Sequence, residues 1–453
     1  VPATVVFTIK PDATNPRGKK KCRIVACGNY APDAEMDCFA AGTDAATLRL
    51  ALAMASKKAW YGANLDVKTA FLNAPMTRPQ RDSEEEEGLS KILLRPPPIL
   101  VSLGHVTKDQ FWEVLKAMYG FRQSPRLWSD YRDDSMRKMK TSKLHLVQME
   151  TEHSARLMKS QEDDETHGII LTYVDDVLIL STKEVVEEWV DLIRRTWETS
   201  SPEWVNPDEP TRFLGMELKR SEEGIWTASQ KNYTLEVLRK NLKKTPWPRK
   251  KIPISKEGAE SEEEDQKKEE DEDVGPKTPA EVKEAQKVVG ELIWLVTRCR
   301  PDLMYVTTKM ASWSTRNPRK VLDMAGQVWG YLAGTVNSTL QLKGPLDSND
   351  MEVHTDASYG DDAHGCVVVK WGEAAILWRS AKQTLQTTST AEAELVEIME
   401  GATMADSVRV VVEELVGERV RCWQFTDSAS ALSIVSGDSA SWRTRHLRKR
   451  ARF

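Results

Sequence analysis

The sequence GIILTYVDDVLIL occupies residues 168–180 and contains two apolar runs separated by a short acidic turn. Apolar runs of this length around a turn predict a buried β-hairpin, which places Asp175 and Asp176 at its tip. A further apolar stretch at residues 64–67, NLDV, predicts a strand that carries Asp66. Strands from distant parts of the chain can thus bring three carboxylates to one point.

A cluster of three carboxylates suits a pair of divalent cations. Mg²⁺ prefers hard oxygen ligands, and nucleotide polymerisation uses two such ions, one at the attacking oxygen and one at the leaving pyrophosphate. The motif at 173–176 alone is equally compatible with an ordinary polar hairpin tip. The choice between the two interpretations therefore depends on the surrounding sequence.

The length of 453 residues predicts two to four domains, because single hydrophobic cores rarely extend beyond about 250–300 residues. No apolar run reaches the length of about 18 residues that a transmembrane helix needs, so no membrane span is expected. Val1 and Pro2 begin the chain without an initiator Met or a signal-peptide pattern. This start suggests an internal cut from a longer polyprotein or an incomplete gene model.

Cysteine and charge patterns narrow the class further. The six cysteines include no C-x2-C pair, which argues against a zinc site and fits reduced thiols inside a cell. The net charge is −5, but residues 261–273 hold nine acids and two lysines, and removing their net −7 leaves +2. The overall charge therefore does not exclude a nucleic-acid partner. An acidic, Pro-flanked linker or loop is expected at 246–280.

Hydrophobic periodicity predicts the elements of the first half of the chain. A turn rich in Pro, Asp, Asn and Gly is expected at 10–21, and residues 140–167 show no clear pattern. Helices are expected at 47–58, 111–118, 127–139, 184–196 and 230–241, and strands at 22–27, 64–67, 92–94 and 213–220.

The second half begins with three predicted helices, at 280–297, 301–313 and 318–335. A new unit follows, with the order β-β-β-α-β-α and an expected mixed sheet. Its strands are expected at 351–357, 364–371, 374–380 and 419–426, and its helices at 389–416 and 428–436.

This last unit carries a second set of acids. Asp356 and Asp427 end two of its strands, and Glu392 and Glu394 lie early in its long helix. Residues two apart on a helix point about 200° from each other, so only one of the two glutamates can face the aspartates. Acids on two strand ends and one helix in this order form the ribonuclease H pattern, a two-metal site that activates water against RNA.

Five segments, in order, resemble the reverse transcriptases of copia-type retrotransposons, the Pseudoviridae, over roughly residues 5–245. Any one of them is moderately specific, and the five together are highly specific. The family segments are KARLVA, MDVKTAFLNG, LYGLKQAPRAW, YVDD and FLGIE; they correspond here to residues 21–26 (KCRIVA), 64–73 (NLDVKTAFLN), 118–128 (MYGFRQSPRLW), 173–176 (YVDD) and 213–217 (FLGME).

The resemblance implies an α+β right-hand polymerase with fingers, palm and thumb, followed by an α/β RNase H-like domain with a mixed sheet. It implies that two Mg²⁺ or Mn²⁺ ions bind at each active site. The implied metal ligands and catalytic residues are Asp66, Asp175 and Asp176. Phe71 would be the steric gate under the incoming sugar. The other implied nucleotide contacts are Lys21, Arg23, Gln123 and Pro125. The implied primer grip consists of Phe213, Leu214 and Gly215.

The resemblance continues through the C-terminal half. The family box STEAEY places its second acid at the metal site, which selects Glu394 over Glu392 and completes the implied ligand set Asp356, Glu394 and Asp427. Four segments carry the likeness: residues 290–302 (GELIWLVTRCRPD), 377–383 (LWRSAKQ), 427–431 (DSASA) and 443–447 (RTRHL), against family boxes GSLLYLTRTRPDI, WSSKKQ, DNQSAI and RTKHI.

The sequence departs from the family in one respect that bears on activity. The family has a fourth metal-site Asp in an ADxLTK box, and this sequence ends at Phe453 before such a box. The prediction of RNA cleavage is therefore weaker than the prediction of DNA polymerisation. The expected domains are 1–245 for fingers, palm and the start of the thumb, 246–280 for the linker, 281–344 for helical thumb and connection, and 345–453 for an incomplete RNase H-like domain.

The implied partners are an RNA template, a DNA primer, RNA–DNA hybrid, dNTPs and a priming tRNA, with integrase upstream in the polyprotein and no membrane. The implied location is intracellular, in a cytoplasmic virus-like particle, the nucleus or both. A basic tail at 443–452 is expected to contact nucleic acid, a nuclear-import signal being the alternative. The alternative for the whole chain is an inactive or domesticated remnant that at most binds nucleic acid.

Overall fold

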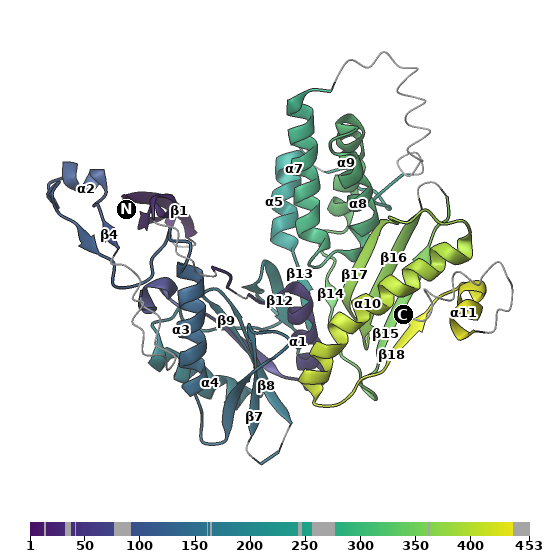
Figure 1. Ribbon diagram of the computed structural model, residues 1–453, viewed down its shortest axis with the longest axis horizontal. Coiled ribbons are helices and arrows are strands. Elements are labelled where there is room, and N and C mark those ends of the chain that lie inside the picture. The colour runs from purple at the N-terminus through teal and green to yellow at the C-terminus, as the bar shows by residue number, and fades with distance from the viewer. Residues whose placement is uncertain are drawn as a thin grey trace.

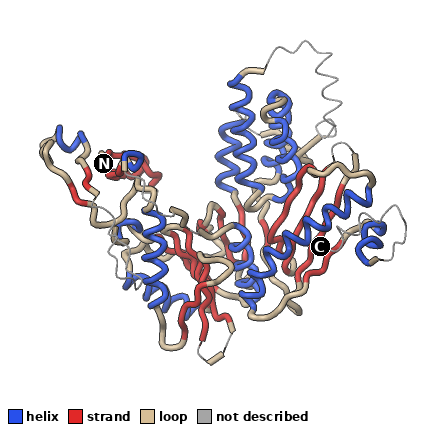
Figure 2. The backbone as a smooth tube through the Cα atoms, viewed as in Figure 1, coloured by secondary structure: helices blue, strands red, loops and turns tan. Residues whose placement is uncertain are grey.

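The computed structural model describes most of the chain (Figures 1 and 2). The expected acidic loop at 261–273 and the basic tail at 443–452 lie outside the described residues. None of the described helices combines the length and apolar character that crossing a bilayer requires. The described ranges are 1–12, 15–31, 38–40, 42–76, 92–160, 162–163, 165–242, 247–255, 277–360 and 363–437.

A six-stranded sheet in the order β10-β3-β9-β8-β7-β6 forms the centre of the N-terminal half. The predicted hairpin is confirmed as β8 and β9, with β3 paired antiparallel to β9. The bounds are β3 (Tyr61–Asp66), β6 (Leu144–Gln148), β7 (Ala155–Ser160), β8 (Thr166–Tyr173), β9 (Asp176–Ser181) and β10 (Glu203–Trp204).

Helices cover both faces of this sheet, which explains why β8 and β9 carry continuous apolar runs, at residues 168–171 and 177–180. Ile170 and Ile179 belong to the core beneath α3 (Ser124–Lys138) and α4 (Lys183–Thr196). Ile169 and Leu171 alternate with them and belong to the core beneath α1 (Ala45–Lys57) on the opposite face. The helices predicted at 47–58, 127–139 and 184–196 are thus confirmed to within a few residues at either end.

Three short-range predictions in this half were wrong, and the first two concern residues 10–21 and 111–118. Residues 10–21 are mostly strand, because β1 (Ala3–Asp12) and β2 (Asn15–Ala26) pair along almost their whole length. Residues 111–118 contain a short strand, β5 (Trp112–Glu113), paired with β4 (Leu93–Leu94), where a helix was expected. Half-buried and exposed residues alternate from 111 to 115, which is the period of a strand.

The strand expected at 213–220 is in fact a tight hairpin. β11 (Thr211–Phe213) and β12 (Met216–Arg220) pair around a two-residue turn. Leu214 and Gly215 both have positive φ, +52° and +73°, as the hairpin turn that matches strand twist requires. Residues 140–167, which showed no pattern, supply β6 and β7.

A helical cluster stands beside the N-terminal half. Its core unites α5 with the three helices predicted between 280 and 335. β13 (Trp226–Ser229) and β14 (Leu340–Gln341) extend the β11-β12 sheet at its base. The helices are α5 (Lys231–Asn241), α7 (Pro279–Val296), α8 (Met304–Trp313) and α9 (Pro318–Gly334).

The C-terminal unit has the predicted mixed sheet, in the order β17-β16-β15-β18. β15 is antiparallel to β16 and parallel to β18, and α10 packs on one face of the sheet. The bounds are β15 (Met351–Ala357), β16 (His364–Trp371), β17 (Ala374–Lys382), α10 (Thr390–Val416), β18 (Cys422–Phe425) and α11 (Ala429–Ser436).

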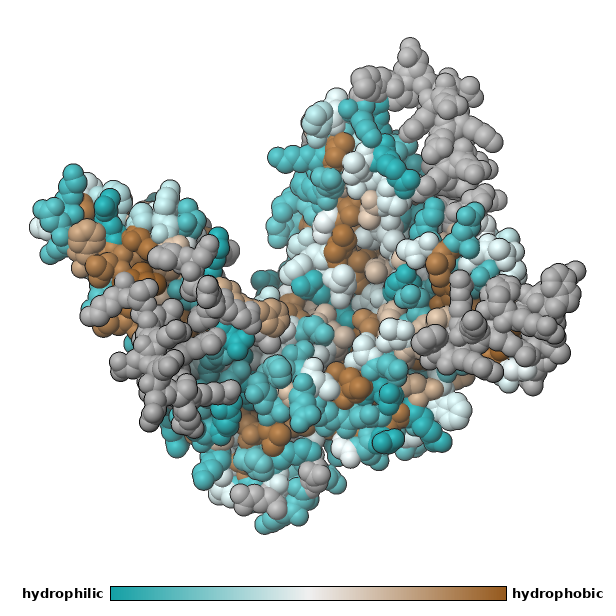
Figure 3. All heavy atoms as spheres, viewed as in Figure 1, coloured by the Kyte–Doolittle hydropathy of each residue, from teal (hydrophilic) through white to brown (hydrophobic). Residues whose placement is uncertain are grey.

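The space-filling view shows a broad notch between the arm formed by β1, β2 and α2 (Pro98–Ser102) and the upright helical cluster (Figure 3). The central sheet lies at the foot of this notch in the ribbon view (Figure 1). The C-terminal sheet stands on the far side of the helical cluster.

One buried arginine, Arg49, links the N-terminal half, the helical cluster and the C-terminal unit. Arg49 on α1 donates to Ile376 O (2.7 Å) in the C-terminal sheet. It also donates to Thr297 O (3.0 Å) and Arg298 O (2.8 Å) at the end of α7. Its guanidinium lies 4.1 Å from the ring centroid of Trp378, so one side chain satisfies three carbonyls from two other units and stacks on a fourth group.

We predict that Arg49→Ala lowers the free energy of unfolding by about 3 kcal/mol or more, because three buried carbonyls lose their donor. Arg49→Lys should restore little, since an ammonium cannot make the forked contacts and the stack together. Urea denaturation measures both changes. The exposed Arg194→Ala on α4 is the control, and equal effects of Arg49→Ala and Arg194→Ala would contradict the joint role.

Two candidate metal centres

The first set of acids is gathered by strand pairing. Asp66 on β3 lies directly opposite Asp176 on β9, and Asp176 also faces Tyr173 across the hairpin. Directly opposed residues on antiparallel strands have Cβ atoms about 4.5–5.5 Å apart. Asp175 sits in the turn between β8 and β9, and its carbonyl accepts from Val67 N at 2.8 Å, which ties the turn to the strand that carries Asp66.

The turn itself is held from the helix side. Val174 has a φ of +55°, an uncommon conformation for a β-branched residue. The indole of Trp128 on α3 donates to Val174 O at 2.7 Å. This bond fixes the exposed tip, so Asp175 and Asp176 are presented in one orientation.

Burial, together with the nearby carboxylates of Asp175 and Asp66, raises the pKa of Asp176 to about 7. Like charges in a half-buried place disfavour ionisation unless a cation joins them. A divalent cation would reverse that preference, so this set of acids has the electrostatic character of a metal site.

We predict that Asp176→Asn stabilises the metal-free protein at pH 8 by about 1–3 kcal/mol, after allowing for solvent screening. The folded state binds the Asp176 proton more tightly than the unfolded state, so stability falls as pH rises from about 4 to about 7 and then levels off. The gain should therefore vanish near pH 4. Thermal melts in EDTA measure it, and a gain that is the same at pH 4 and pH 8 would contradict the shift.

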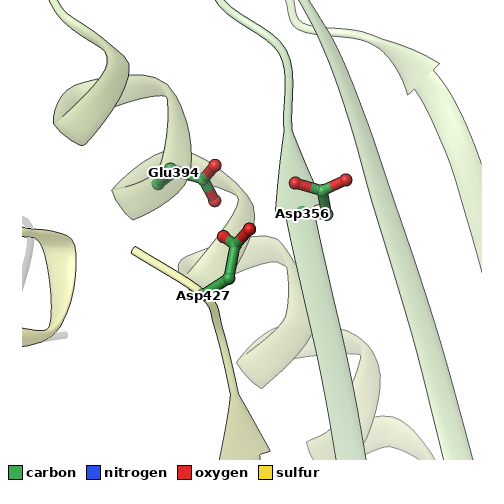
Figure 4. Close-up of side chains that lie close together, drawn as sticks. All are labelled: Asp356, Glu394 and Asp427. Carbon is green, nitrogen blue, oxygen red and sulfur yellow. The ribbon is translucent and has the colours of Figure 1, made fainter. Parts of the chain in front are cut away.

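The second set of acids forms a tighter group. Carboxylate oxygens of Asp356, Glu394 and Asp427 all lie within 4.8 Å of one another, and the three side chains converge from β15, α10 and the end of β18 (Figure 4). Within the described ranges, this is the only group of three or more such side chains close enough to share an ion. Asp66, Asp175 and Asp176 are brought together by the backbone but do not form so compact a group.

Glu394 is the member that points to a cation. It is 7% exposed, and its Oε2 atom is buried without a hydrogen-bond partner. Burial raises its pKa, and Asp356 and Asp427 raise it further. A buried carboxylate oxygen that faces two other carboxylates and has no donor is the arrangement that a hard cation satisfies.

The choice between Glu392 and Glu394 follows from the helix start. Glu392 accepts from Thr388 N (2.8 Å) and Thr388 Oγ1 (2.9 Å), so it caps the first turn of α10. Only Glu394 reaches Asp356 and Asp427.

Sequence reasoning missed a fourth acid, Glu397, which lies near this group on the same helix as Glu394. Glu397 is fully buried, accepts from Arg379 at 2.8 Å and from Gln383 at 3.2 Å, and lies against Gly365. A Cβ at Gly365 would stand 1.9 Å from Glu397 Oε2, so only glycine leaves room for this carboxylate. Its position three residues after Glu394, on the same helix face, was the available signal.

The predicted nucleotide contacts divide into two groups. Lys21 and Arg23 lie on the same face of β2, and Phe71 lies in the short helix η2 (Ala70–Asn73). Gln123 is 7% exposed at the start of α3, and Pro125 is in the first turn of that helix. Gln123 is therefore packed inside the fold and does not line an open surface.

The predicted primer-grip residues form the β11–β12 turn, and they contact the helical cluster. Phe213 and Leu214 are buried, and Arg298 donates to Leu214 O at 3.1 Å. A Cβ at Gly215 would lie 2.6 Å from the ring of Trp294 on α7. The turn is thus locked against α7.

Comparison with known proteins identifies the family to which this chain belongs. Residues 1–256 match the family model described as reverse transcriptase (RNA-dependent DNA polymerase), and the chain belongs to this family. The match covers the central sheet, both hairpins and α5.

Similar proteins indicate which kind of reverse transcriptase this chain resembles. The chain is 25% identical to the Transposon Ty1-GR1 Gag-Pol polyprotein of Saccharomyces cerevisiae over 464 residues, 98% of this chain and 24% of the relative. The Transposon TyH3 Gag-Pol polyprotein of the same species is 25% identical over 451 residues, with 95% and 23% covered. The chain is therefore similar to a region of Ty1-type Gag-Pol polyproteins, which confirms the predicted resemblance, and it spans about a quarter of the length of these relatives.

Proposed function

We propose that this chain is an RNA-directed DNA polymerase that extends a DNA primer on an RNA template, with a tethered RNase H-like unit that cleaves the RNA of the hybrid. The observation that carries the polymerase assignment is the cross-strand pair of Asp66 and Asp176, with Asp175 beside it, in a chain of the reverse transcriptase family. The raised pKa of Asp176, caused first by burial and then by the charges of Asp175 and Asp66, supports a site for cations.

In this proposal Asp66, Asp175 and Asp176 hold two Mg²⁺ or Mn²⁺ ions, which supply activation of the primer 3′-oxygen and stabilisation of the leaving pyrophosphate. The protein contributes position and charge. The bond from Trp128 to the turn keeps both aspartates fixed, and Lys21 and Arg23 present positive charge toward the triphosphate. Phe71 would exclude a ribose 2′-OH.

For the C-terminal unit we propose that Asp356, Glu394 and Asp427 hold the ions that activate water for RNA cleavage. The orphaned oxygen of Glu394 and the compactness of the three acids support this assignment. In the same proposal residues 1–245 act as fingers, palm and start of the thumb, 246–280 as linker, 281–344 as helical thumb and connection, and 345–453 as the RNase H-like domain.

The polymerase proposal predicts extension of oligo(dT) on poly(rA) by the wild-type chain with dTTP and Mg²⁺ or Mn²⁺. Asp175→Asn should lower the rate on the order of 10³-fold, because it removes a metal ligand. Asp134→Asn, which alters only an exposed ion pair with Arg137, is the matched control and should extend normally. No extension by the wild type would favour the alternative of an inactive remnant, and extension by Asp175→Asn would refute the site.

The cleavage proposal predicts that labelled RNA in an RNA–DNA hybrid is cut by the wild type with Mn²⁺. Glu394→Gln should abolish cleavage and leave primer extension unchanged. Glu392→Gln is the neighbouring control, because that side chain caps α10, and it should keep most of the cleavage. Equal loss in both variants would show that the helix start, and not a metal ligand, had been damaged.

A further inference from the structure

A three-membered stack connects the arm to the first metal centre. The ring centroids of Phe71 and Tyr119 are 4.9 Å apart with planes tilted by 57°. The guanidinium of Arg23 lies 5.0 Å from the centroid of the Tyr119 ring. Tyr119 is therefore in contact with a residue of the proposed triphosphate site and with the proposed sugar gate.

Backbone contacts hold Tyr119 in this place. Ala26 N at the end of β2 donates to Tyr119 O at 2.9 Å. Gly120 has a φ of +102°, and a Cβ there would stand 1.9 Å from Ala26 O. A Cβ at Gly28 would likewise stand 2.0 Å from Gly120 O, so the two chain segments cross at a distance that only glycine allows on either side.

The loop is also fixed from the α3 side. The hydroxyl of Ser124 donates to Met118 O at 2.6 Å and lies 3.1 Å from Met118 N, which donates back to it. Tyr119 is half-buried, and burial raises the pKa of its phenol, with Arg23 lowering that pKa and the charges of Asp175 and Asp66 raising it. Gln123, the residue that the sequence assigned to the nucleotide, is by contrast packed away.

We infer that Tyr119 is a positioning residue that fixes the ring of Phe71 and thereby sets the discrimination between deoxyribonucleotides and ribonucleotides. The inference rests on the polymerase function proposed above. A steric gate rejects one additional hydroxyl only if its ring cannot move by about 1 Å, and a displacement of that size is enough to change reaction rates strongly. Tyr119 supplies the packing surface that prevents this movement, and Arg23 in turn contacts the Tyr119 ring.

The test compares kcat/KM for dATP and ATP on an oligo(dA) primer annealed to poly(rU), since these substrates differ only at the 2′ position. Tyr119→Ala should lower the dATP/ATP ratio about tenfold or more, mainly by raising incorporation of ATP. Tyr119→Phe keeps the ring and should retain the wild-type ratio within about twofold. Phe71→Ala should lower the ratio directly, and Phe71→Ala/Tyr119→Ala should be no worse than Phe71→Ala alone.

Tyr61→Ala is the matched control. Tyr61 has the same kind of cation–π contact, with the Arg220 guanidinium 4.0 Å from its ring centroid, but it lies at the opposite end of β3 from Asp66. This variant should lose comparable stability and keep the dATP/ATP ratio. If Tyr119→Ala does not fold, as judged by circular dichroism, Tyr119→Leu keeps the bulk, removes the aromatic ring and should give the same loss of discrimination.

The outcomes separate the inference from the proposed function. A wild-type chain that extends no primer refutes the polymerase proposal, and the inference with it. If the wild type extends and Phe71→Ala loses discrimination, an unchanged ratio in Tyr119→Ala or Tyr119→Leu overturns the inference alone. An additive double variant also overturns it, because Tyr119 would then act independently of Phe71.

Discussion

The pairing of β3 with β9 is the constraint on which the rest of this structure depends. It places Asp66 opposite Asp176, and a shift of one residue would turn every side chain of β9 to the other face of the sheet. The register is protected because both faces are buried, with α3 and α4 on one and α1 on the other.

The two candidate metal centres differ in how the repulsion between carboxylates is accommodated. In the N-terminal centre the pKa of Asp176 is raised. The backbone hydrogen bond from Val67 N to Asp175 O holds the turn closed. In the C-terminal centre it is the pKa of Glu394 that is raised. A second buried acid, Glu397, forms an ion pair with Arg379. The glycine at 365 makes space for the Glu397 carboxylate.

The central hairpin could be predicted from sequence because its information is local: two apolar runs, a short turn and acids at the tip. The order of the C-terminal strands and helices was accessible for the same reason. Residues 10–21 were assigned wrongly because turn-forming residues mark the tip of a hairpin without showing how far its strands extend. At 213–220 the error was the opposite one, because the two-residue turn at Leu214 and Gly215 was taken as part of a single strand. Gln123 was assigned to the nucleotide from its motif, and its burial depends on the packing of α3, which no local pattern records.

Contacts between segments far apart in the chain could not be predicted from the sequence. They also determine how the two centres are held relative to each other. Arg49 occupies a position in α1 where an apolar side chain would be expected from its buried neighbours, yet it bonds to carbonyls more than 240 residues away. The same core cluster contains residues of α1, β8, β16 and α10, and Glu414 near the end of α10 accepts from Thr151 N in the N-terminal half. Because the C-terminal sheet shares this core with the central sheet, the two cannot separate without exposing apolar surface. If both centres act on one nucleic acid, the distance between them along the duplex is therefore set by packing around α1, and a change at Arg49 would alter both centres through that one joint.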